Sequence, residues 1–288
     1  MRRAAGAVVG WLAPEAPPAR AAVARMLVGA FAIVYLIARL RYFADGSRHT
    51  AADFAPVGVC AILDAPLPAA ATWAIALATI ALGISFTAGR RLGLVGPAFF
   101  VALLWTITYA SSWGKILHSE NLLVLHVGVF ALAGASSDER AAGWALRAAA
   151  IATALTYVVA GATKLRAGGA AWLSGDALGG WLAWDALRKI ELGSFHSPLA
   201  ARVAGSPALL QGLALYTLVV ELGAPLALAS RRAAYAWAAL AWLFHAGILA
   251  TMAIGFFYPL SGVAFAPLLP VERIGALRRL AERLARGG

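Results

Sequence analysis

The sequence has little charge. Only 13% of its 288 residues are Asp, Glu, Lys or Arg, whereas a soluble domain carries about 25%. Hydrophobic residues make up 62% of the chain, and its mean hydropathy is +0.79. Such a chain has too little polar surface to cover itself in water, so most apolar side chains must face lipid or one another. This composition excludes an ordinary soluble enzyme and predicts an all-α, polytopic membrane protein.

Cysteine is almost absent. The single residue, Cys60, excludes an intrachain disulfide and a thiolate metal site. The five histidines are scattered along the chain, so no metal site is predicted. The net charge is +11, but the basic residues stand between apolar runs and form no continuous stripe. We therefore expect membrane lipid as a partner and no nucleic acid.

Familiar catalytic motifs are also missing. The sequence has no phosphate-binding G-x-x-x-x-G-K-[ST] loop, no H-E-x-x-H helix and no G-x-S-x-G turn. The Asp-rich metal motif of soluble prenyl transferases is absent as well. No cofactor is encoded in a readable motif, so any chemistry must come from isolated polar residues within apolar segments.

Long apolar runs are abundant, and a bilayer core of about 30 Å needs about 20 such residues per helix. Seven runs occur, at residues 26–42, 71–88, 92–111, 122–135, 145–162, 208–229 and 233–269. The last run is too long for one spanning helix. Its breakers Gly247, Gly255 and Pro259 favour two helices. We expect these to meet near Thr251, which gives about eight transmembrane helices in one bundle, with both termini on the same side.

The basic residues predict the orientation of the bundle. The N-terminal end, the turn at Arg90, the loop at 138–147, the turn at Arg231 and the C-terminal tail together hold most of the Lys and Arg. The positive-inside rule places both ends in the cytoplasm. We expect the protein in the inner (cytoplasmic) membrane of the cell. Residues 44–66, 112–121 and 164–207 then share the outer face.

Three segments are expected along the chain. Residues 1–21 are interpreted as a cytoplasmic, amphipathic or loose segment, with a cleaved signal peptide as the alternative. Residues 22–270 form the transmembrane domain. Residues 271–288 are a basic, amphipathic, cytoplasmic tail that lies on the inner leaflet or anchors the topology.

Ionisable groups at membrane depth are functional candidates. Lys164 closes an apolar helix and is a candidate base, or else a lysine that snorkels to the headgroups. Glu221 lies inside an apolar run, so we expect it to be protonated or paired with a histidine or lysine across the bundle. His245 is comparably deep and begins an apolar face that reaches Phe256. An apolar chamber with few polar groups suits a lipid-soluble substrate.

A second candidate segment, SSWGKILHSENLL, is a short polar connection before an apolar helix. It contains the interfacial aromatic Trp113, together with His118 and Asn121. His118 can orient a substrate or pair with the lysine, or it is a wetted loop residue.

Read together, these segments resemble the membrane domain of the vitamin K-dependent gamma-carboxylase and its bacterial relatives, the HTTM (horizontally transferred transmembrane) proteins. The matching pieces are ILDAPLP, SSWGKILHSENL, AGATKLRAGGAAWLSGDAL and WLFHAGILATMAIGFF, in collinear order between residues 22 and 269. The resemblance implies that Lys164 is the catalytic lysine, that His118 helps to position a reduced quinone and that His245 is a site histidine. It also places Glu221 where the carboxylase has an aspartate.

Two departures from the family pattern bear on activity. Thr163 replaces the first lysine of the family's lysine pair, and residues 114–117 replace its paired asparagines. We also expect the chain to lack the large lumenal domain that holds protein substrates in the animal carboxylase. Carboxylation of a propeptide-bearing protein is therefore not expected.

Three functions follow from these observations. The first is a carboxylase-like enzyme that uses Lys164 on a quinone or other isoprenoid lipid, with one cavity lined by Lys164, His118 and His245. The second is a membrane-embedded terpene cyclase, in which aromatic rings stabilise a substrate cation and Arg166, Arg188 and Lys189 hold a diphosphate, with Mg²⁺. The third is a non-catalytic membrane partner or a toxin-maturation or immunity protein, whose protein partner is unknown. The side chains expected to bind substrate are Trp113, Asn121, Arg166, Trp172, Asp176, Glu221 and Phe256, and the aromatic rings of the cyclase reading also include Trp181 and Trp184.

Overall fold

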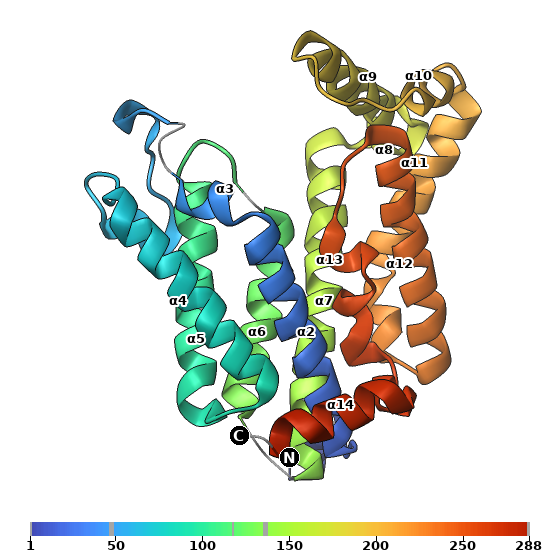
Figure 1. Ribbon diagram of the computed structural model, residues 1–288. Helices are drawn as coiled ribbons and strands as arrows, with labels where there is room; N and C mark the ends of the chain where they lie inside the picture. Colours follow the sequence, from blue (N-terminus) through green and yellow to red (C-terminus); the bar gives the residue numbers. More distant parts are fainter. Residues whose placement is uncertain (1, 46–48, 117, 135–137, 287–288) are drawn as a thin grey trace. The chain divides into compact units, whose positions relative to one another are not determined.

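The computed structural model describes residues 2–45, 49–116, 118–134 and 138–286. Within these ranges the regular structure is helical and no strand occurs (Figure 1), so the predicted all-α class is confirmed. The chain divides into two compact units. One consists of Met1–Ala149 with Pro270–Gly288, and the other is Ala150–Leu269. One long helix, α7 (Glu139–Gly168), begins in the first unit and ends in the second.

Five helices are long and apolar enough to cross a membrane: α2 (Pro18–Ala38), α4 (Ala69–Ala88), α5 (Leu92–Ser111), α7 and α12 (Arg231–Met252). Two shorter apolar helices are α6 (Asn121–Ala133) and α11 (Pro207–Leu222). Each of these seven helices overlaps one of the seven apolar runs of the sequence, and α2 begins at Pro18, before the predicted start at residue 26. The chain therefore has the helices of a multi-pass membrane protein.

The last apolar run differs from the prediction. Helix α12 ends at Met252, close to the predicted break at Thr251. The remainder forms only α13 (Phe257–Leu260) and the 3-10 helix η6 (Val263–Leu268). Pro259 and Pro267 each lack a backbone N–H, and Gly262 has a φ of 78°, so a regular helix cannot continue. The expected second spanning helix is therefore wrong, and the described residues contain five helices long enough to span a membrane and two shorter apolar ones, so the count of eight is not confirmed.

Four apolar helices form the body of the first unit. Helix α2 packs against α4 and α6, and α5 packs against α4 and α6 (Figure 1). The core contains Phe86 and Phe99, whose ring centroids lie 5.2 Å apart, and Phe130. A Cβ atom at Gly96 would lie 3.1 Å from the Ala131 Cα atom, so glycine allows α5 and α6 to approach this closely.

Arginines fix one end of the first unit. The buried Arg25 guanidinium donates to the carbonyl oxygens of Phe86 and Thr87, which are in the last turn of α4. A cation at this position satisfies C-terminal carbonyls and interacts favourably with the helix dipole. Arg20, in the first turn of α2, pairs with Glu272 at 2.7 Å. This pair joins the C-terminal segment to α2, where α14 (Gly275–Arg286) packs against α2 and α4.

The first unit also contains the shorter elements α1 (Arg2–Leu12), α3 (Leu40–Ala44), η2 (Ala51–Asp53), η3 (Gly58–Ile62), η4 (His118–Glu120) and η7 (Val271–Arg273). At the end away from Arg25, residues 49–66 meet residues 112–121. The Ala55 N–H donates to the Ser112 carbonyl at 2.8 Å, and His49 stacks on Trp113 with ring centroids 5.0 Å apart.

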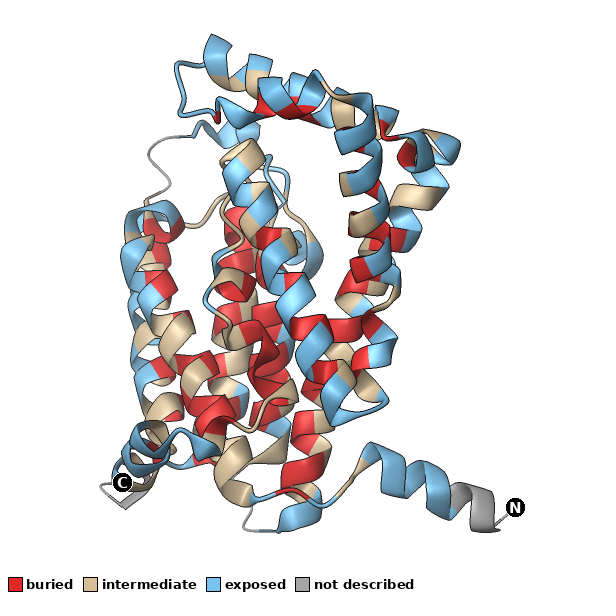
Figure 2. Cartoon of the chain, turned by 90° about the vertical axis from the view of Figure 1, so that its right-hand side faces the viewer, coloured by how far each residue is buried: buried red, intermediate tan, exposed pale blue. Residues whose placement is uncertain are grey.

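The second unit folds the long polar segment at residues 164–207 into helices. These are the end of α7, then α8 (Ala170–Ser174), α9 (Asp176–Glu191) and α10 (Leu199–Ala204). Helix α11 follows, and η5 (Ala224–Leu228) leads into α12. The core centres on Trp237, whose ring makes edge contacts with Tyr157 and Phe265. The buried positions of these helices appear in red in Figure 2.

Candidate functional site

The centre of the candidate site is an ion pair between two helices of the second unit. Lys164 Nζ, on α7, donates to Glu221 Oε1, on α11, at 2.5 Å. The lysine side chain is 26% exposed and the glutamate side chain only 4%. A Cβ atom at Gly161 would lie 3.0 Å from the Glu221 Cβ atom, so glycine at this position lets α11 approach α7. The expected partner of Glu221 is therefore a lysine.

A second buried pair lies on the same face of α7. The Tyr157 hydroxyl and His245 Nε2, on α12, are 2.7 Å apart. Tyr157 precedes Lys164 by two helical turns, and Gly161 lies between them, so all three residues share one face. Sequence reasoning missed Tyr157. The signal that could have found it is this i, i+4, i+7 spacing of a polar ring, a small residue and a lysine.

The two pairs form one polar cluster, which we call the α7 cluster: Tyr157, Lys164, Glu221 and His245. Two buried atoms of the cluster, Glu221 Oε2 and His245 Nδ1, have no hydrogen-bond partner among the described residues. The carboxylate oxygen can only accept, whereas Nδ1 donates if the tyrosine hydroxyl donates to Nε2. A ligand hydroxyl is both donor and acceptor and so matches the needs of both atoms.

Aromatic rings adjoin the α7 cluster. Lys164 Nζ lies 5.7 Å from the ring centroid of the buried Trp172. The His245 ring is 5.2 Å from the Phe256 ring and 5.0 Å from the Phe244 ring. The structure thus brings two predicted binding residues, Trp172 and Phe256, next to two predicted catalytic residues.

Other predicted residues of the second unit have different surroundings. Arg166 and Asp176 are exposed, and the Asp176 carboxylate accepts a hydrogen bond from Ser174 Oγ at 2.7 Å. Asp185, which is 4% exposed, pairs with Lys189 at 2.7 Å and Arg188 at 3.3 Å.

The pairs with Asp185 change the roles expected of its neighbours. Lys189 Nζ also donates to the Met252 carbonyl at the end of α12. Arg188 lies 5.1 Å from the Trp184 ring centroid, where the cyclase reading places a substrate cation. These two cations thus already have protein partners.

The remaining predicted residues belong to the first unit. Trp113 contacts His49 and Phe54, both with ring centroids 5.0 Å away, and Asn121 is exposed at the start of α6. His118 lies in η4, and its side chain is outside the described part of the structure. That His118 shares a cavity with Lys164 and His245 stays a prediction.

The same segment holds a buried acid. Glu120 accepts hydrogen bonds from the Tyr35 hydroxyl and, at 2.5 Å, from Ser119 Oγ. Arg39 pairs with it at 3.6 Å. These contacts tie the segment before α6 to α2, and they give Glu120 a structural task that its sequence position does not reveal.

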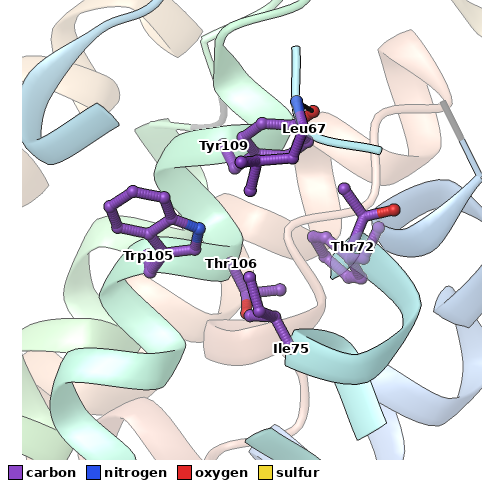
Figure 3. A pocket seen from close by; sticks show the side chains of 7 residues that line it. Leu67, Thr72, Ile75, Trp105, Thr106 and Tyr109 are labelled. Carbon is purple, nitrogen blue, oxygen red and sulfur yellow. Dashed lines mark hydrogen bonds between the residues drawn. The ribbon is translucent and has the colours of Figure 1, made fainter. Parts of the chain in front are cut away.

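A small pocket lies in the first unit between α3, α4 and α5 (Figure 3). Its lining residues are Phe43, Leu67, Thr72, Ile75, Trp105, Thr106 and Tyr109. Trp105 Nε1 is buried and has no partner among the described residues. The Tyr109 oxygen accepts from the Leu67 N–H at 3.0 Å, which leaves its own O–H to donate. The pocket therefore favours a small group that accepts hydrogen bonds.

No three His, Cys, Asp or Glu side chains in the described ranges are grouped so that they could hold a metal ion. Comparison of the chain with protein-family models, curated proteins and solved structures gives no match. The resemblance to the carboxylase membrane domain therefore stays a prediction, and the α7 cluster carries the functional argument.

Proposed function

We propose that the chain is an integral membrane enzyme that performs acid–base chemistry on a hydroxyl-bearing quinone or isoprenoid lipid, with Lys164 as the base. The observation that carries the proposal is the pair between the half-buried Lys164 and the buried Glu221, beside Tyr157 and His245. Ionisable groups are costly in an apolar interior, and a cluster of them in a helical membrane protein points to function.

The ion pair supplies a route to a neutral lysine. Transfer of one proton from Lys164 Nζ to Glu221 converts the pair into an amine and a carboxylic acid. An apolar surrounding disfavours separated charge more than water does, so it favours this neutral form. The amine can then accept the proton of a substrate hydroxyl, and the resulting ammonium pairs with the substrate oxygen.

The surroundings fit such a substrate. Glu221 Oε2 and His245 Nδ1 provide one acceptor and one further hydrogen-bonding atom. Trp172 and Phe256 provide flat apolar surfaces beside them. A reduced quinone, which the family resemblance implies, has a planar ring with hydroxyl groups and would supply the oxidisable part of the reaction. The cyclase alternative has less support, because Asp185 already binds Arg188 and Lys189.

Mass spectrometry of co-purifying lipids tests the proposal. We expect the wild type to enrich a quinone or isoprenoid lipid, and Lys164→Ala to accumulate its unreacted form. Lys115→Ala, at an exposed lysine of the first unit, is the matched control and should behave as wild type. Identical bulk phospholipid in all three proteins would contradict an enzyme centred on Lys164.

A further inference from the structure

Helix α1 presents an apolar face whose side chains are largely exposed. Val8, Val9, Trp11 and Leu12 are 57%, 61%, 46% and 40% exposed. Figure 2 shows the helix next to the N-terminus in the pale blue of exposed residues. At about 100° per residue these four side chains share one side of the helix. Gly6 and Gly10 lie on the opposite side, where an added Cβ atom would meet nothing within 4 Å. Residues 6–12 therefore present an apolar side and, opposite it, the two glycines.

Contacts with α7 fix where α1 can be. The Ala16 N–H donates to the Glu139 carbonyl at 3.1 Å. A Cβ atom at Gly143 would overlap the Pro14 carbonyl oxygen, so the connecting segment lies directly on α7. The Arg147 guanidinium lies 5.0 Å from the Trp11 ring centroid. The end of α1 is thus held at the beginning of α7.

These contacts also hold α1 at the end of two candidate membrane spans. Residues 13–17 are all that separates α1 from α2, and so short a segment reaches at most about 18 Å. Both α2 and α7 are apolar and long enough to cross a bilayer. A helix attached to their ends lies at the depth of the lipid headgroups.

The same end of the first unit is strongly basic. Arg90 and Arg91 are exposed in the turn after α4, a few residues beyond the carbonyl groups that accept hydrogen bonds from Arg25. The C-terminal segment, tied to α2 through Glu272, adds the exposed residues Arg273, Arg279 and Arg283. Exposed arginines at the same end of the unit as an exposed apolar helix face are complementary to anionic lipid.

From these observations we infer that α1 lies in the interface of a bilayer that contains anionic phospholipid. Its apolar side enters the acyl boundary, and the exposed arginines at this end of the unit contact the phosphates. Trp11 marks the interfacial level, as aromatic residues do at the ends of membrane helices. The inference concerns an interaction surface and does not depend on the chemistry proposed for Lys164.

Nitroxide labels on α1 test the inference. Cys60 is fully buried, so Val9→Cys and Gly10→Cys each add one reactive thiol to the full chain, with unlabelled wild type as the blank. The proteins are placed in nanodiscs of phosphatidylcholine with phosphatidylglycerol. We expect the label at position 9 to collide more with oxygen than with a water-soluble nickel complex, and the label at position 10 to show the reverse.

Variation of lipid charge distinguishes contact of α1 with the membrane from a requirement for anionic lipid. In phosphatidylcholine alone, or at high salt, the oxygen preference at position 9 should fall toward that at position 10. An unchanged preference would overturn the requirement for anionic lipid. Equal access of the nickel complex to both positions in the anionic discs would overturn the membrane contact itself. If Cys60 takes up label in the blank, the same pair is measured with Cys60→Ala.

Discussion

The Tyr157 hydroxyl is the single described hydrogen-bond partner of the His245 ring, through Nε2. Because Nδ1 has no described partner, Tyr157→Phe leaves a buried imidazole without any hydrogen bond. A buried polar group left unsatisfied costs about 1–3 kcal/mol of unfolding free energy. We expect the variant to unfold at a lower temperature and, under the proposed function, to shift the pH profile of the reaction.

Tyr216→Phe is the matched control for this substitution. Its hydroxyl donates to the Leu240 carbonyl at 2.6 Å in a partly exposed place. Removal of that bond should cost about 0.5–1.5 kcal/mol and leave the pH profile unchanged. Equal effects of both variants on the pH profile would show that Tyr157 does not position His245.

The Lys164–Glu221 pair should respond asymmetrically to removal of either partner. Lys164→Met strands a carboxylate that is 4% exposed, which costs about 3–5 kcal/mol, less whatever protonation recovers. Glu221→Leu leaves a lysine that is 26% exposed and can turn toward the surface, so it should cost less. The double variant Lys164→Met/Glu221→Leu should lose less unfolding free energy than the sum of the losses in the two single variants.

A double-mutant cycle on thermal unfolding measures this coupling. The exposed pair Arg278–Glu282 provides the comparison, where about 0.3–0.5 kcal/mol is expected. A coupling of that small size at Lys164 and Glu221 would mean that the pair is solvated and would remove the main support for a buried base.

How far the residues were predictable depends on the range of the interaction. A carboxylate within an apolar run must be protonated or paired, so the sequence alone limited Glu221 to these two states. The identity of that partner depends on the approach of α11 to α7 at Gly161, a contact between distant parts of the chain. The sequence did not indicate a role for Tyr157, because an aromatic residue is common in an apolar helix.

At the level of elements, the end of α12 contains a strained residue. Ala253 has a φ of 51°, in the left-handed region that favours glycine. Ala253→Gly should raise the unfolding free energy by about 0.5–1 kcal/mol, since relief of the strain exceeds the added chain entropy. Ala250→Gly, within the same helix, should instead lower it by about 1 kcal/mol. Thermal unfolding of the two variants measures both effects. Destabilisation by both substitutions would contradict backbone strain at Ala253.

Helices could be predicted from the sequence where each one forms all its backbone hydrogen bonds within itself. Apolar length alone located seven helices, because a spanning helix needs no distant partner for its hydrogen bonds. The segment at residues 164–207 is different, since α8 to α10 are held by contacts such as Lys189 with the Met252 carbonyl. The predicted spanning helix within residues 253–269 does not form for a local reason, because two prolines and a glycine stop a regular helix there.

At the scale of the whole chain, one ion pair connects its two ends within the first unit. Arg20 begins α2, and Glu272 precedes α14, so their pair closes nearly the full length of the sequence. Burial alone would raise the pKa of Glu272. Hydrogen bonds from Arg20 and the backbone, with the charges of Arg20 and Arg273, outweigh burial and hold that pKa below its usual value.

The lowered pKa makes the docking of α14 dependent on pH. A carboxylate whose pKa is lower in the folded state stabilises that state fully above its unfolded pKa of about 4.3. This contribution is lost as the pH falls through the folded pKa, when Glu272 takes up a proton and Arg20 loses its partner. Hydrogen exchange of residues 275–286, corrected for intrinsic rates, should therefore show loss of protection below about pH 4. Glu272→Gln should show the reduced protection already at neutral pH and little further change, and an acid-induced loss equal to that of the wild type would assign the transition to other groups.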